Sequence, residues 1–197
     1  MKNGVTLIEL MVAVALLGVI LLTAATLDVA ARKFFNASDR VAEMQCEVSP
    51  VLLRIKKDIN QAQGNINNRG VFIETGPTTR LRFRNGPGVD NVYLTADDTW
   101  GAYVWNGNNI EFYDSVPAPP APFGNPTLKE IVSAGVIDFT LTTINDFNPP
   151  ILDYPVTLAV SITSCYDASL LLGACGSNNN PQITLATSAH ALSQSAR

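Results

Sequence analysis

The first 64 residues carry two successive hydrophobic patterns. Residues 5–27 are apolar except for one charged side chain, Glu9. Further on, apolar residues recur at intervals of three and four, which places them on one side of an α-helix. We predict one long helix with an apolar half, residues 5–27, and an amphipathic half, residues 28–64, stopped by Gly64. The amphipathic stripe consists of Val41, Met44, Val48, Leu52, Ile55 and Ile59.

Pro50 interrupts the amphipathic half. Proline lacks a backbone donor and crowds the preceding turn, and Ser49 could cap a new helix that has Pro50 at its first position. We therefore predict a kink or a short break there, with the stripe in phase on both sides.

After residue 64 the pattern becomes that of short strands separated by turns. The NGNN turn at residues 106–109 predicts a hairpin between residues 102–105 and 110–113. The proline-rich residues 117–126 predict an extended loop. The sequence thus indicates an α+β fold, with a β-rich head formed by residues 65–197. The other predicted strands are residues 71–74, 80–84, 91–94, 135–144 and 155–163.

Composition and charge exclude few classes of function. The chain has 197 residues, 47% of them hydrophobic, and a formal net charge of −4. An acidic protein does not suit general nucleic-acid binding, which requires clustered Lys and Arg. Nucleic acid is therefore an unfavoured partner, although small local basic patches remain compatible with this charge.

The apolar half is long enough to span a bilayer. As a helix it would measure roughly 35 Å, against a hydrocarbon core of about 30 Å. Lys2 on the N-terminal flank places the N-terminus in the cytoplasm by the positive-inside rule. A secretory signal cut near Thr23-Ala24-Ala25 is an alternative. Glu9 and the helical pattern that continues past this cut count against it.

Three cysteines are present, and two of them enclose a short loop. Cys165 and Cys175 predict a disulfide in an oxidising compartment, which would contribute roughly 2 to 3 kcal/mol. Three reduced thiols in a cytosolic chain are the alternative. Cys46 would remain, either buried or paired between chains.

The segment GVTLIEL, residues 4–10, resembles the class III signal of type IV prepilins and their relatives. The resemblance implies a leader, residues 1–4, that prepilin peptidase removes between Gly4 and Val5, followed by methylation of Val5. Glu9 then becomes the fifth residue of the mature chain, and the implied partner of its carboxylate is the Val5 amine of a neighbouring subunit. The alternative is a Glu9 that is protonated, or that reaches the membrane edge.

Residues 52–64, LLRIKKDINQAQG, are similar to the end of the long helix in minor pilins and in J-type pseudopilins of type II secretion. The resemblance implies a structural subunit, and we favour a minor pilin. Its partners would be other pilin or pseudopilin subunits, prepilin peptidase and an inner-membrane assembly platform. It would cross the inner membrane once, with a periplasmic head, and then enter a periplasmic or extracellular filament. An anchored or secreted β-rich binding domain is the other interpretation.

Candidate catalytic and metal-binding residues are few. His190 is the only histidine, without a recognisable nucleophile beside it, and Cys165 and Cys175 lack zinc-site spacing. Asp97 and Asp98 could bind calcium, but adjacent carboxylates also suit a solvated turn. We predict no enzyme, no metal and no cofactor.

Arg80, Arg82 and Arg84 alternate with Leu81 and Phe83, so the three arginines share one face of a strand. They could contact phosphate or the carboxylates of a neighbouring subunit. The alternative, which we favour, is the solvated face of an edge strand that charge protects against aggregation.

Overall fold

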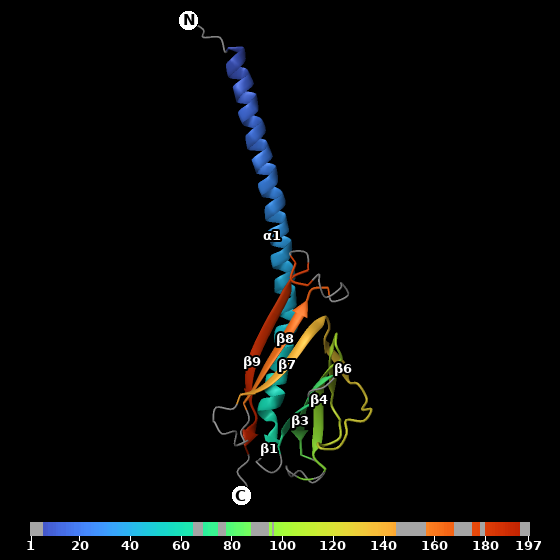
Figure 1. Cartoon of the computed structure of the whole chain (residues 1–197). Helices are drawn as coiled ribbons and strands as arrows, with labels where there is room; N and C mark the ends of the chain where they lie inside the picture. The colour runs from blue at the N-terminus through green and yellow to red at the C-terminus, as the bar shows by residue number, and fades with distance from the viewer. Residues whose placement is uncertain are drawn as a thin grey trace. The chain divides into compact units, whose positions relative to one another are not determined.

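The computed structural model describes residues 6–64, 69–74, 78–87, 95, 97–144, 157–167, 175–177 and 180–193. The chain forms two compact units, residues 1–40 and residues 41–197. Helix α1, Leu7–Gln61, runs from the first unit into the second (Figure 1). The strands are β1 Gln63–Gly64, β2 Val71–Glu74, β3 Thr79–Gly86, β4 Thr99–Trp105, β5 Ile110–Tyr113, β6 Glu130–Ser133, β7 Val136–Ile144, β8 Thr157–Cys165, β9 Gln182–His190 and β10 Leu192–Ser193.

Within the first unit, α1 is exposed on every side as far as residue 36, and it is apolar up to residue 27 except at Glu9. Each described residue from 6 to 36 is exposed, and the helix is long and apolar enough to cross a membrane. A helix that is hydrophobic all round needs either lipid or other protein around it.

Within the second unit, α1 buries the predicted stripe. Met44, Val48, Leu52, Ile55 and Ile59 are buried, and Val41 packs against them. The periodicity therefore identified the face of the helix that meets the head, and this prediction is confirmed.

The break predicted at Pro50 is wrong, because α1 continues through it. Pro50 and Cys46 are both exposed, so water can reach the Cys46 carbonyl that would otherwise accept from residue 50. Buried Val48 and Val51 hold the helix to the head on both sides of the proline. The helix ends at Gln61, before the predicted Gly64, because β1 pairs in parallel with β10.

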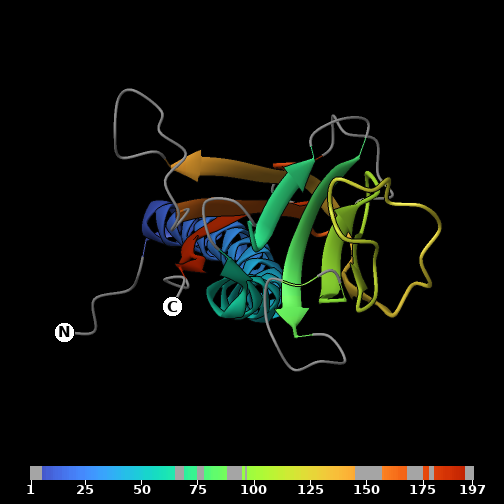
Figure 2. The same ribbon diagram turned by 90° about the horizontal axis from the view of Figure 1, so that it is seen from below.

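Two antiparallel sheets complete the second unit. One has the order β2-β3-β4-β5-β6 and the other has the order β7-β8-β9. Their inner side chains and the buried stripe of α1 form one core, and Figure 2 shows the end of α1 beside strands of both sheets. The predicted α+β fold with a β-rich head is confirmed.

Most of the predicted strands are present, and the hairpin is formed by β4 and β5. Trp105 pairs with Ile110, and the Asn106 side-chain oxygen accepts from the backbone N–H groups of Asn108 and Asn109. Gly107 takes a φ of 98°, which suits glycine in this tight turn. The strand predicted at residues 91–94 lies outside the described residues.

Besides the two-residue strands β1 and β10, the strands β6 and β9 were not predicted from the sequence. β9 has Ile183 and Thr184 near its start but ends in the small and polar residues Ser188, Ala189 and His190, so its sequence is a weaker strand signal than that of β8. It forms because it pairs with β8 along its whole length. β6 is short and follows the proline-rich loop, where its four residues gave no clear alternation.

The five-stranded sheet is covered on both faces. Leu81 and Phe83 of β3 belong to the core shared with α1. On the opposite face, a second apolar cluster centres on Trp100, Val104 and Val116. The loop of residues 114–129 lies on this outer side, drawn in yellow in Figure 2. A sheet covered on both faces leaves no wet face for β3.

Candidate functional site

Glu9 lies in the first turn of α1 and is bonded to Thr6. Its carboxylate accepts from the Thr6 backbone N–H at 2.8 Å and from the Thr6 hydroxyl at 2.9 Å. The Glu9 backbone N–H donates to Thr6 Oγ1 at 3.4 Å. This reciprocal arrangement is a capping box, which satisfies backbone donors that the helix start leaves free.

The capping box gives Glu9 a local role that our sequence analysis missed. The signal was present as Thr6-x-x-Glu9, the spacing of a capping box before an apolar run. Both residues are exposed. The carboxylate is thus oriented by its own helix while it stays open to a further partner.

Gly4 and Val5, the predicted cleavage and methylation residues, lie outside the described residues. Their place in the chain still matters chemically. Cleavage before Val5 would create an amino group one residue from Thr6, next to the end of the helix that carries Glu9. Cleavage and methylation stay predictions.

The N-terminal region matches a known family model. Residues 1–25 match the prokaryotic N-terminal methylation motif. The chain carries a type IV prepilin-like signal. This signal supports a protein of the pilin or pseudopilin type and is consistent with membrane anchoring through α1. Comparisons with curated proteins and with solved structures gave no match.

Downstream of the prepilin-like signal, the three arginines of β3 contradict one of the two sequence interpretations. β3 lies between β2 and β4, so the edge-strand interpretation is wrong. The Arg82 side chain is only 2% exposed and pairs with Glu74 at 2.5 Å. Arg84 is also buried and pairs with Asp98 at 2.8 Å. Arg80 is 33% exposed and lies 3.5 Å from Glu74.

Arg82 connects the sheet to the loop of residues 114–129. Its Nη1 donates to the carbonyl oxygens of Pro117 at 3.2 Å and Ala121 at 2.8 Å. Its guanidinium also lies over the Phe123 ring, 5.2 Å from the centroid. Burial lowers the pKa of Arg82, and Glu74 opposes that change. The main contacts of Arg82 thus lie within the chain, and an anion contact of the three arginines stays a prediction.

The cysteines and acidic residues occupy defined positions. Cys165 and Cys175 form the predicted disulfide, with their Cα atoms 5.9 Å apart. Cys46 is free and exposed on α1, so the buried alternative is wrong. Asp98 is buried against Arg84, which does not fit the solvated turn. The described part of the chain holds no cluster of three or more His, Cys, Asp or Glu residues that could bind a metal.

His190 has a structural environment. Its Nδ1 lies 2.8 Å from the Thr157 hydroxyl, across the β8–β9 ladder. Its backbone N–H donates to the Asn60 side-chain oxygen at 2.9 Å, which fastens the end of β9 to α1.

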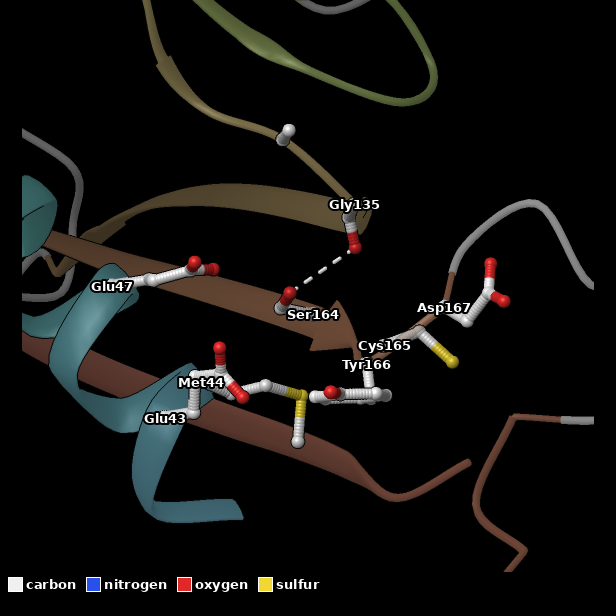
Figure 3. Close-up of a pocket in the computed structure, with 9 residues that line it drawn as sticks. Glu43, Met44, Glu47, Gly135, Ser164, Cys165, Tyr166 and Asp167 are labelled. Carbon is white, nitrogen blue, oxygen red and sulfur yellow. Dashed lines mark hydrogen bonds between the residues drawn. The ribbon is translucent and has the colours of Figure 1, made fainter. Parts of the chain in front are cut away.

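A cavity of about 420 Å³ lies where α1 meets the ends of β6, β7 and β8. Glu43 and Glu47 of α1 line one side of the cavity, and Asp167 lines another. Figure 3 shows the Met44 side chain directed toward the Tyr166 ring. The lining of the cavity carries three carboxylates and is therefore negative. Sequence analysis missed this cavity because the residues that line it come from segments about a hundred residues apart.

Polar contacts join α1 to the central strand β4 and to the edge strand β6 of the five-stranded sheet. The buried Tyr103 hydroxyl donates to Asp58 at 2.5 Å, and Arg54 pairs with Glu130 at 2.6 Å. Burial and the bond to Asp58 raise the pKa of Tyr103. Burial and the bond to Glu111 raise the pKa of Tyr113 to about 12.

These shifts predict a loss of head stability at alkaline pH. The folded state keeps Tyr103 protonated above its unfolded pKa near 10, so the stabilisation is complete below about pH 10 and declines above it. Above that pH the phenol ionises in the unfolded state, so the free energy of unfolding falls by up to about 1.4 kcal/mol per pH unit for Tyr103. Urea unfolding of the full chain in detergent from about pH 8 to about 11 measures this.

The variant Tyr103→Phe should lower stability at neutral pH by about 1 to 3 kcal/mol, because Asp58 loses its donor. The free energy of unfolding of this variant should also fall less steeply above about pH 10. Tyr166→Phe, at an exposed tyrosine, is the control that should change neither quantity. An unchanged alkaline slope in Tyr103→Phe would refute the role of this phenol.

Proposed function

We propose that the chain is a structural subunit of a type IV-like filament, in the role of a minor pilin. Prepilin peptidase would cut after Gly4, and methylation would follow at Val5. The observation that carries this proposal is Glu9, a charged residue in an otherwise apolar half-helix whose continuation packs into a folded head. Such a chain has a membrane-compatible stem and a separate soluble part.

The apolar half is exposed on every side, so either lipid or neighbouring subunits can cover it. Lipid can surround this half before assembly, and neighbouring helices can replace the lipid afterwards. A carboxylate costs several kcal/mol in hydrocarbon unless it is neutralised. Glu9 is already oriented by Thr6, so pairing with the Val5 amine of a neighbour would require little rearrangement. That pair would set the register between subunits.

A pseudopilin of type II secretion is the second candidate, supported by the similarity of residues 52–64 to J-type pseudopilins. Both candidates use prepilin peptidase, an inner-membrane assembly platform and other subunits of the same type. In both, the head would lie outside the cytoplasm before assembly. They differ in the compartment of the filament, which is extracellular for a pilus and periplasmic for a pseudopilus.

Intact mass of the mature protein tests the processing step. We expect a chain that begins at Val5 and carries one added methyl group. Gly4→Val should block cleavage, since glycine allows close approach of the scissile backbone. Gly18→Ala is the matched control, because a Cβ at Gly18 meets open space. A mature chain that begins after Ala25 would assign the protein to the secreted class.

A further inference from the structure

Three consecutive residues beyond the apolar span combine charge with exposed aromatic surface. Phe34 and Phe35 are 70% and 63% exposed, and their rings meet edge to face with centroids 6.1 Å apart. Lys33 precedes them and is exposed. We call residues 33–35 the collar.

The collar is spread over about 200° of the helix circumference. Successive helical residues are rotated by about 100°, so Lys33, Phe34 and Phe35 point in three different directions. Before assembly, a single partner helix would contact one side of α1 and leave part of the collar in water. A lipid surface meets the helix from all sides, and thus fits this distribution.

The position of the collar fits the headgroup layer. Residues 7–27 span about 30 Å, the thickness of the hydrocarbon core, and Lys33 follows about 9 Å later. Helical side chains tilt toward the N-terminus, so the lysine stem and the rings lean back toward the span. Aromatic and basic side chains are favoured at this depth.

The charges beside the collar leave Lys33 available to an anion. Arg32 pairs with Asp28 at 2.9 Å, one turn earlier on α1. In the described parts of the chain, no ion pair includes Lys33. A shallow groove of about 410 Å³, lined by Ala25, Thr26, Val29 and Ala30, ends at Lys33. An acyl chain can lie along these small side chains while its phosphate meets the ammonium group.

We propose that the collar binds the phospholipid headgroup layer on the outer side of the membrane and sets the depth of the unassembled subunit. This inference rests on the membrane-anchored state of the proposed function. Phosphate contacts Lys33, and the two rings lie among the headgroups.

Depth measurement in a bilayer tests the collar. The full chain would carry Cys46→Ser, which removes the free cysteine, and Asn36→Cys, which introduces the cysteine to be labelled with a nitroxide. Cys165 and Cys175 are bridged, so the label attaches only at residue 36. The vesicles contain phosphatidylethanolamine and phosphatidylglycerol. Electron paramagnetic resonance saturation by oxygen and by a nickel chelate reports depth. We expect the label at headgroup level.

Combining Lys33→Gln, Phe34→Ala and Phe35→Ala should move the label toward water by roughly one helical turn, about 5 Å. Lys57→Gln with Leu53→Ala, at exposed positions further along α1, should leave the depth unchanged. A water-exposed label in the parent chain, or an unchanged depth in the triple variant, would overturn the inference.

A triple variant that keeps its depth but loses filament incorporation would assign the collar to a second copy of the chain, and would also overturn the proposal. Substitution of Glu9 tests the filament role without touching the collar, so the two proposals can fail separately.

Discussion

Glu9→Leu should strongly reduce filament incorporation while membrane insertion is kept or improved. Removal of a carboxylate from the apolar half lowers the cost of insertion. Loss of the intersubunit ion pair in an apolar environment should reduce incorporation by at least about tenfold, since a buried pair broken on one side costs several kcal/mol. Fractionation into membrane and sheared-filament pools measures both quantities in one experiment.

Two further variants separate the charge of Glu9 from its capping role. Glu9→Gln retains an acceptor for the capping box and removes the charge, so it should fail in assembly as Glu9→Leu does. Thr6→Val removes the cap and keeps the charge, so it should assemble better than either variant of Glu9. Normal incorporation of Glu9→Leu would contradict the assembly role. Failure of Thr6→Val alone would assign the effect to the cap.

Arg82→Met should destabilise the head by about 1 to 3 kcal/mol, because buried Arg82 is lost together with its hydrogen bonds, while Glu74 stays partly in water. The substitution leaves Glu74 without its closest cation and removes two hydrogen bonds to the loop of residues 114–129. Urea unfolding of the full chain in detergent, followed by the fluorescence of Trp100 and Trp105, measures the change.

Arg80→Met is the matched control for Arg82→Met. Arg80 also faces Glu74, but at 3.5 Å and with a 33% exposed side chain, so its loss should cost less than about 1 kcal/mol. Glu74→Gln should then lower stability more in the Arg80→Met protein, which keeps Arg82, than in the Arg82→Met protein. Equal costs for the two arginines would show that burial does not distinguish them.

The sequence by itself determined the features that depend on neighbouring residues. The stripe from Val41 to Ile59 follows from a 3.6-residue period, and the NGNN turn specifies its hairpin through the local geometry of Asn106 and Gly107. The apolar half and the position of Glu9 within it are likewise visible in one short segment, which also matches the family model. The disulfide was predictable from a short spacing and an exported chain.

Tertiary structure decided which of the residues on a common face are exposed to water. Arg80, Arg82 and Arg84 alternate as a wet strand face would, yet Arg82 is buried by a loop that lies 35 to 39 residues further along the chain. β9 exists because β8 offers a partner, and Pro50 is tolerated because the head holds the helix on both sides of it. Local periodicity assigns residues to a common face. What covers that face depends on contacts between distant segments, which carry no period in the sequence.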